Sequence, residues 1–171
     1  MLALPAVAQS QFRRRPLPDA IDCRILDLLQ EDAMMSAAAV ADKVGLSPTP
    51  CWRRIKKLED DGIILKRVAL LDRRKASLDL LAYVEVQVDR HSETAAEAFK
   101  EAVLREPLVV GCYAMTGGYD YLLRVVAPNL DAYADFTMKR LLKMPDVKGI
   151  QSSFVLDTIK DSPALPLDYL A

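Results

Sequence analysis

The sequence predicts an α+β protein built from an N-terminal winged helix-turn-helix and a C-terminal ferredoxin-like βαββαβ domain. Two patterns lead to this prediction. Three short amphipathic helix patterns fill residues 19–60, with a tight turn between the second and the third. Strand, helix, strand, strand, helix and strand signals then follow one another through residues 82–159. A chain of 171 residues, 51% of them hydrophobic, can bury a core in each part.

Composition excludes several classes of protein. The chain has no run of about 18 consecutive apolar residues, so no segment is expected to span a membrane. Three cysteines without a CxxC pair argue against a disulfide framework and a cysteine zinc site. A single histidine, His91, nearly excludes catalytic triads and histidine metal sites. We therefore expect no enzyme, no metal and no cofactor. Residues 1–9 lack the basic start of a signal peptide, so we expect a cytoplasmic protein.

Residues 1–18 are expected to form a flexible arm. This stretch contains three prolines and the run Arg13-Arg14-Arg15, without a periodic pattern. Two interpretations stay open: an overlong choice of start codon, or a tail that makes weak phosphate contacts.

The first two helices follow from apolar spacing and from their ends. Residues 19–30 place Ile21, Ile25, Leu28 and Leu29 on one helical face. Ser36 is a suitable N-cap for a helix over residues 37–44, and Gly45 ends it.

The third helix begins after a short turn and runs to about residue 60. Pro48 suits its first position, where no N–H is needed. Pro50 also lacks an N–H, so Ser47 is expected to cap only the N–H of Thr49. The tight turn before this helix completes the helix-turn-helix pattern.

Two short apolar runs follow Gly62, at residues 63–65 and 68–71. They predict either a β-hairpin wing around Lys66-Arg67 or one longer strand that continues into a linker. We assign residues 19–69 to the helix-turn-helix domain and the charged stretch at 70–81 to the linker.

Charge is unevenly distributed along the chain, although the net charge is only -1. Residues 1–67 hold 11 basic and 9 acidic side chains, whereas residues 68–171 hold 12 and 15. The basic excess is concentrated at residues 44–67, with 6 basic against 3 acidic side chains. A contact with nucleic acid would need the excess there.

The third helix has an apolar face and a basic face. On a helical wheel Cys51, Ile55 and Leu58 form the buried stripe, and the opposite face points outward. The alternative is a surface helix with ordinary solvated charges. With the preceding helix and turn, the pattern favours a helix that enters the DNA major groove. The candidate DNA contacts are Ser47, Thr49, Arg53, Arg54, Lys56 and Lys57.

Two residues flank the buried stripe. Arg54 lies about 70° from the centre of the stripe on the wheel, so we expect it to be partly covered and paired with a carboxylate or a phosphate. Trp52 lies at about 90°, and we expect it to be partly buried by packing.

The second half predicts strands at residues 82–88, 108–115, 121–126 and 147–159, and helices at 93–105 and 131–142. Val84, Val86 and Val88 alternate along the first strand, and we expect them to form a face covered by a second copy of the chain. We assign residues 82–159 to this domain and expect the tail at 160–171 to cover a partner surface.

A glycine turn joins the two middle strands. Gly117-Gly118 lets backbone N–H groups approach a small zwitterion, and Asp120 could accept from its ammonium group. A plain hairpin also uses glycine in such a turn, so this alternative stays open.

Two motifs in the right order carry a family resemblance. The stretch from Ser36 to Glu59, followed by Gly62-Ile63-Ile64, closely resembles the helix-turn-helix of the Lrp/AsnC (feast/famine) transcriptional regulators. The turn at residues 116–123 is similar to the turn of their effector domain, and residues 151–156 and 159–167 resemble the end of the Lrp-type subgroup. The resemblance covers about residues 19–167.

The resemblance implies a regulator that binds double-stranded DNA and a small amino acid, in dimers that assemble further, typically into octamers. It implies an effector site between effector domains of neighbouring dimers, and work at the nucleoid in the cytoplasm. Gly118 and Trp52 depart from the usual pattern of the family. The implied effector residues are Thr116, Gly117, Gly118, Tyr119 and Asp120 on one side and Gln151, Ser152 and Ser153 on the other.

Three functions compete. The first is a transcriptional regulator that responds to an amino acid, and the second is an architectural DNA-binding protein of the same build that ignores ligands. The third is an enzyme on the ferredoxin-like half, which is disfavoured because the sequence has no nucleophile–base pair, metal cluster or phosphate loop.

Overall fold

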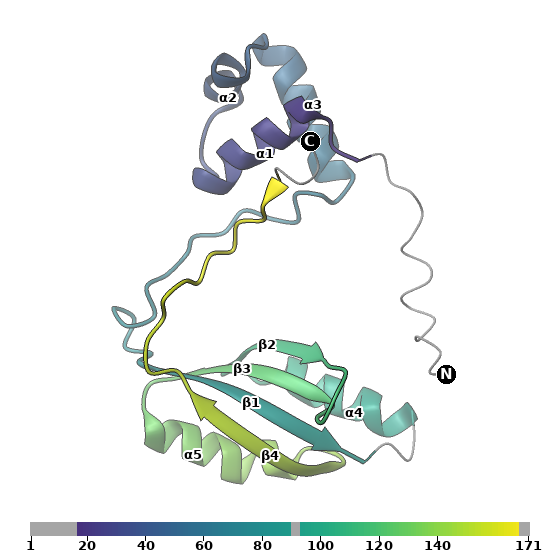
Figure 1. The fold of residues 1–171 in the computed structure, drawn as a ribbon, viewed down its shortest axis with the longest axis vertical. Coiled ribbons are helices and arrows are strands. Elements are labelled where there is room, and N and C mark those ends of the chain that lie inside the picture. Colours follow the sequence, from purple (N-terminus) through teal and green to yellow (C-terminus); the bar gives the residue numbers. More distant parts are fainter. Residues whose placement is uncertain (1–16, 90–92, 168–171) are drawn as a thin grey trace. The chain divides into compact units, whose positions relative to one another are not determined.

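The computed structural model describes residues 17–89 and 93–167, which divide into two compact units (Figure 1). One unit contains the described residues up to Ala69 together with those from Ser162 onward, and the other is Leu70–Asp161. We call them the helical unit and the sheet unit. Most of the expected arm, and also His91, lie outside the described residues.

The helical unit consists of α1 (Ala20–Glu31), α2 (Ala37–Val44) and α3 (Pro48–Asp60). Ser36 caps α2 by accepting from the N–H of Ala39 at 3.2 Å, and Gly45 ends it in the left-handed region at φ 73°. All three helices contribute to one core, which confirms the predicted helix-turn-helix. The buried residues of these helices are Cys23, Ile25, Leu26, Leu29, Val40, Ala41, Val44, Cys51, Ile55 and Leu58.

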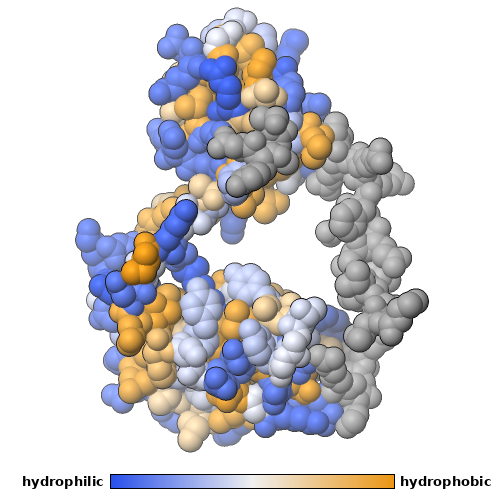
Figure 2. All heavy atoms as spheres, in the orientation of Figure 1, coloured by the Kyte–Doolittle hydropathy of each residue, from blue (hydrophilic) through white to orange (hydrophobic). Residues whose placement is uncertain are grey.

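The predicted wing does not form. Residues 61–79, all of them described, contain no strand, so the expected strands at 63–65 and 68–71 are wrong. A hairpin needs an apolar face that packs on something. Here Leu65, Leu70 and Leu71 are 87%, 72% and 81% exposed. Figure 2 shows hydrophobic side chains exposed along the segments that connect the two units.

The sheet unit confirms the predicted βαββαβ order. Its four strands are all paired antiparallel in the order β2-β3-β1-β4. The elements are β1 (Leu80–Val88), α4 (Glu93–Leu104), β2 (Val109–Ala114), β3 (Tyr121–Ala127), α5 (Leu130–Lys139), a 3-10 turn (Leu141–Lys143) and β4 (Val147–Phe154).

The last strand is shorter than predicted. It ends at Phe154, which pairs with Ala82, instead of continuing to residue 159. One further bond joins the N–H of Val155 to the carbonyl of Leu81. Because β1 begins at Leu80, which the register places opposite Leu156, the chain beyond Leu156 has no neighbouring strand to pair with.

Both helices cover the same face of the sheet (Figure 1). Val84 and Val86 are fully buried there, in one cluster with Phe99 of α4 and Phe136 of α5. We predicted that a second copy of the chain covers the alternating valines. This prediction is wrong, because helices of the same chain cover them. The register places the residues of the uncovered face, which are Tyr83, Glu85, Gln87, Tyr113, Leu122, Arg124, Gln151 and Ser153.

The described end of the tail also differs from expectation. Leu167 is only 9% exposed and belongs to the core of the helical unit. We expected the tail to cover the surface of a partner. For Leu167 this expectation is wrong, because the residue packs against helices of its own chain.

Candidate nucleic-acid interface and ligand pocket

Helix α3 presents a polar face on the side away from its buried stripe. Cys51, Ile55 and Leu58 are 0%, 6% and 3% exposed and hold the helix against α1 and α2. Figure 2 shows hydrophilic side chains over much of the visible surface of the helical unit. Of the predicted DNA contacts, Arg54 is half-buried and the others are exposed, namely Ser47, Thr49, Arg53, Lys56 and Lys57.

The start of α3 offers unused hydrogen-bonding groups. Ser47 occupies the N-cap position, but its side chain makes no capping hydrogen bond, so the expected bond to Thr49 does not form. Prolines occupy the first and third positions of the helix, which leaves Thr49 as the one donor in its first three residues. A hydroxyl and an N–H at a helix N-terminus are suited to a phosphate oxygen.

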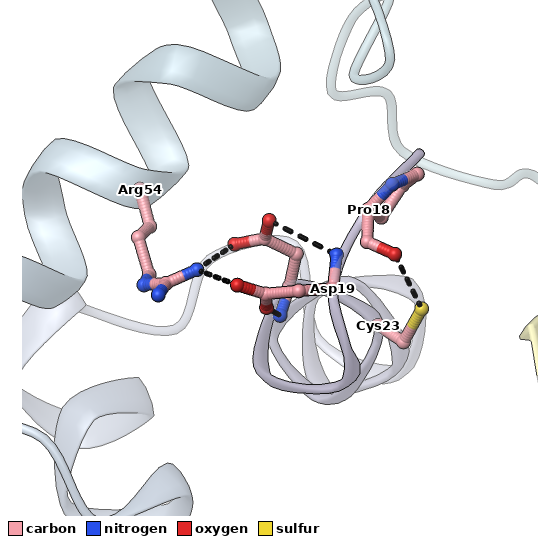
Figure 3. A network of polar contacts seen from close by, with 5 residues as sticks. Pro18, Asp19, Cys23 and Arg54 are labelled. Atoms are coloured by element: carbon pink, nitrogen blue, oxygen red, sulfur yellow. Dashed lines mark hydrogen bonds and ion pairs between the residues drawn. The ribbon is translucent and has the colours of Figure 1, made fainter. Parts of the chain in front are cut away.

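Arg54 is held by two carboxylates at the start of α1 (Figure 3). Its guanidinium donates to Asp19 at 2.7 Å and to Asp22 at 2.8 Å, which confirms the expected pairing with a carboxylate. The two aspartates also form a capping box, in which each side chain accepts from the other residue's N–H. This network ties α3 to the start of α1 and occupies the guanidinium, so we assign Arg54 to positioning rather than to reading a base.

The network shifts the ionisation of its members. The pKa of Asp19 lies below its ordinary value of 3.8, because its carboxylate accepts first from the N–H of Asp22 and then from Arg54. The pKa of Arg54 is raised by the same two carboxylates.

The remaining basic residues of α3 differ in availability. Lys56 pairs with Asp60 at 3.0 Å, a contact that raises the pKa of the lysine. Arg53 and Lys57 form no ion pair with any of the described residues. These two cations can meet phosphate or base edges without breaking an existing pair.

Trp52 does not pack as expected. It is 56% exposed, so the prediction of a partly buried packing role is wrong. Its ring lines a depression of about 410 Å³ beside α3, together with Met34, Met35 and Arg67. The residue lies beside the buried stripe of α3, and its side chain is left mostly open to solvent.

The glycine turn between β2 and β3 is tied to β1. Gly117 adopts φ 123°, which an L side chain rarely adopts. The carbonyl of Gly118 accepts from the side chain of Gln87 at 2.9 Å. The Asp120 carboxylate accepts from the N–H of Val88 at 2.9 Å, so this residue holds the end of β1.

A pocket of about 340 Å³ opens beside this turn, on the uncovered side of the sheet. It brings together three of the predicted effector residues, Gly118, Tyr119 and Gln151. Thr116, Gly117, Asp120 and Ser153 are not among its lining residues. The other lining residues are Glu85, Gln87, Gly149 and Ile150.

Ser152 is separated from the pocket by strand geometry. It pairs with Val84, whose side chain lies under the helices, and its hydroxyl is hydrogen-bonded to that of Tyr133. Neighbouring side chains in a strand point to opposite faces, so the side chain of Ser152 faces the helices while that of Gln151 faces the open side of the sheet. This rule was available from the sequence once the strand had been predicted.

Sequence reasoning missed Glu85 and Gln87. Both alternate with the buried valines of β1, a pattern that marks the polar face of a strand. What the sequence could not supply was the register, in which Glu85 pairs with Gln151 and Gln87 with Gly149. The pocket therefore offers one carboxylate and two side-chain amides, which can bind a small polar molecule carrying a positive charge.

No group of three or more His, Cys, Asp or Glu residues in the described ranges could hold a metal ion. Within the same ranges no helix has the length and apolar character needed to cross a membrane.

Comparison with known proteins gives the family. Residues 19–59 match the AsnC-type helix-turn-helix domain, and residues 81–165 match the Lrp/AsnC ligand binding domain. The chain belongs to the Lrp/AsnC family. This membership identifies a DNA-binding transcriptional regulator with a ligand-binding domain, and not an enzyme, in agreement with the sequence patterns.

Individual Lrp/AsnC regulators match over nearly their whole length. The DNA-binding transcriptional activator DecR of Escherichia coli is 40% identical over 150 residues, which span 88% of this chain and 99% of that protein. The structure of regulator NMB0573 of Neisseria meningitidis in complex with L-Met is 39% identical, with a TM-score of 0.86. An AsnC family regulator from Agrobacterium tumefaciens is 44% identical, with a TM-score of 0.84. Both structures cover 90% of this chain and 99% of their own.

Proposed function

We propose that this regulator binds a free amino acid in the pocket beside the glycine turn and changes its DNA binding in response. The observation that carries the proposal is the pocket itself, where Glu85 and Gln151 face Gly118 on the open side of the sheet. The L-Met complex of a regulator that is 39% identical supports an amino acid as the ligand class.

The chemistry of the pocket assigns the ends of the ligand. Glu85 can accept from the ammonium group, a role first expected for Asp120, whose carboxylate already accepts from Val88. Gln151 supplies an amide donor for the carboxylate group, and Gln87 can add the second N–H of its amide, since the first donates to Gly118. Among the residues that the structure describes, no lysine or arginine lines the pocket, so these residues offer no counterion to an acidic side chain on the ligand. We therefore propose an uncharged ligand side chain, apolar or sulfur-containing, and L-methionine is the first probe.

Calorimetry with the full chain tests this assignment. L-Methionine or another uncharged amino acid is expected to give a saturable heat, and Glu85→Gln to weaken binding about tenfold or more. Glu101→Gln on α4, where the carboxylate is exposed, is the matched control and is expected to bind normally. If none of the twenty amino acids gives heat, the architectural interpretation replaces this one.

On the DNA side, we propose that α3 enters the major groove. Arg53 and Lys57 are the first candidates for DNA contacts. Lys56 can join them once it leaves its partner Asp60 and binds a phosphate instead. The N-terminus of α3 at Ser47 and Thr49 supports a backbone phosphate contact. Selection from a pool of random DNA duplexes tests this assignment and gives the preferred DNA site. That site is then the probe for measuring the DNA affinity of α3 variants.

We also propose a homo-oligomer built on the uncovered face of the sheet. Tyr113 and Tyr83 are 53% and 36% exposed there, beside the paired residues Leu122 and Arg124. Aromatic side chains and arginine are enriched at protein interfaces. We propose a dimer on this face and a larger ring, the octamer that the family resemblance implies. In such an assembly a neighbouring copy of the chain would close the pocket. Light scattering at about micromolar concentrations, with and without L-methionine, tests both.

As a DNA-binding regulator, the chain is proposed to work in the cytoplasm at the nucleoid. Imaging of a fluorescent fusion together with a DNA stain tests that location.

A further inference from the structure

The C-terminal tail follows the sheet unit in the sequence but packs in the helical unit. Residues 162–167 belong to the same compact unit as α1, α2 and α3. Leu167 is 9% exposed and joins the core formed by those helices. A helix-turn-helix of this size has a small core, so one added leucine is a considerable fraction of it.

Gln30, near the end of α1, holds the tail at its backbone. Its side-chain oxygen accepts from the N–H of Leu165 at 2.6 Å, and its side-chain nitrogen donates to the carbonyl of Leu165 at 3.2 Å. One amide therefore satisfies both backbone groups of one tail residue, which fixes the register of the tail. Pro163 and Pro166 restrict the backbone on either side, and this lowers the entropy lost on docking.

The other end of α1 contacts the DNA-reading helix. Asp19 and Asp22 at the start of α1 bind Arg54 of α3. A helix of 12 residues is a rigid rod of about 18 Å. Helix α1 therefore joins two contacts. Gln30, near the C-terminal end of α1, binds the tail, and Asp19 and Asp22, at the N-terminal end of α1, bind α3.

The chain before the tail is also fixed at both ends. Val155 bonds to the carbonyl of Leu81 in β1, and Asp161 pairs with Arg124 of β3 at 2.6 Å. Gln151 of the ligand pocket lies in β4, four residues before Val155 in the sequence. The route from pocket wall to tail is thus short and held by directional bonds.

We propose that the docked tail is a second covalent connection through which the ligand pocket acts on α3, with Gln30 and Leu167 as positioning residues. This inference rests on the proposed ligand response and adds its route. Ligand binding against β4 shifts the segment at 155–161, the tail transmits the shift to α1, and Arg54 passes it to α3.

Docking is tested without any ligand, by hydrogen exchange of the full chain. Leu167→Ala is expected to raise the exchange rates of α1 amides about tenfold or more, and Gln30→Ala to raise them less. Leu165→Ala is the matched control, because this side chain is 66% exposed and only its backbone is bonded. Amides of the sheet unit are expected to be unchanged. Unchanged exchange of α1 in both Leu167→Ala and Gln30→Ala overturns the docking.

Transmission is tested by loosening the connection while keeping the dock. Inserting about six Gly-Ser residues after Asp161, between its pair with Arg124 and the docked residues 162–167, gives the tail slack. Calorimetric binding of L-methionine and exchange of α1 are expected to stay as in wild type, whereas the L-methionine effect on DNA affinity falls by more than half. A full effect in the insertion variant overturns the route. Absence of L-methionine heat in wild type refutes the proposed ligand instead, and the exchange experiment still decides the docking.

Discussion

The two units build their sites in different ways. In the helical unit the candidate DNA contacts come from one turn and one helix, between residues 47 and 57. In the sheet unit the pocket draws residues from β1, the glycine turn and β4, between residues 85 and 151. A helix brings its side chains onto one face by its own periodicity, whereas a sheet does so only through the register of strands distant in sequence. The first kind of site can therefore be found from local spacing, and the second cannot.

The units also use their charges differently. Around α3 the side chains form ion pairs at the surface, such as Arg54 with Asp19 and Lys56 with Asp60. Around the pocket the glycine turn is held by hydrogen bonds to backbone groups, from Gln87 to Gly118 and from Val88 to Asp120. Salt should therefore weaken the arrangement of the helical unit more than that of the pocket.

The largest expected effect tests whether the two units are independent. Phe136→Ala removes a fully buried ring from the core of the sheet unit and should cost about 3–5 kcal/mol of unfolding free energy there. The single tryptophan, Trp52, lies on α3 and reports on the helical unit alone. In denaturant titrations the circular dichroism transition of the sheet should move, while the Trp52 fluorescence transition stays in place. Met138→Ala, at an exposed position of α5, is the control. Equal movement of both transitions would show one cooperative body.

The next effect concerns DNA affinity. Arg53→Ala should weaken binding by about 1–3 kcal/mol if the guanidinium reads a base, and should then relax sequence preference. Lys57→Ala should instead lower the slope of log affinity against log salt by about one. Fluorescence anisotropy across a salt series separates the two outcomes. Lys139→Ala, an exposed lysine on α5, should bind like wild type. Normal binding by the Arg53, Lys57 double variant at every salt concentration would sink the assignment.

A smaller effect concerns the Asp19–Arg54–Asp22 network and depends on pH. The folded-state pKa of Asp19 is depressed, so its contribution to stability is present above the unfolded value of 3.8 and is lost as pH falls through the folded value. Because Asp19 and Arg54 are 52% and 34% exposed, we expect only about 1 kcal/mol. Asp19→Asn should lower stability at neutral pH and flatten the acid limb of a stability–pH curve. An unchanged acid limb would contradict this account.

The smallest expected effect is a gain. Asp60→Asn removes the carboxylate that pairs with Lys56 and that would repel a DNA phosphate. DNA affinity at low salt should rise about twofold, and the gain should shrink as salt is added. Glu31→Gln on α1 is the matched removal of one negative charge and should change affinity less. A loss of affinity in Asp60→Asn would mean that the aspartate positions Lys56 for DNA.

Much of the fold was predictable, because local patterns agreed with one another. Ser36 and Gly45 marked the ends of α2 as the structure has them, and the glycine turn separated β2 from β3. The candidate site was only partly predictable. Gly118, Tyr119 and Gln151 line the pocket, whereas Ser152 lies on the other face and Glu85 was missed. The omission of Glu85 follows from register, which no short motif encodes, whereas the error at Ser152 was avoidable from strand alternation.

The sequence by itself determined the periodic features: three amphipathic helices, the βαββαβ order and the outward face of α3. Each depends on the spacing of residues that are neighbours along the chain, so propensity and periodicity suffice. Only the tertiary structure decided which polar groups already have a bonding partner within the chain and which apolar side chains are already covered. It showed Arg54 bound by two carboxylates, Asp120 holding the end of β1, and the valines of β1 covered by helices. It also placed Leu167 in a core formed by helices that end about a hundred residues earlier in the sequence, at Asp60. Such contacts join segments far apart in the chain, and their choice depends on which surface each segment can bury, a property of the folded molecule as a whole.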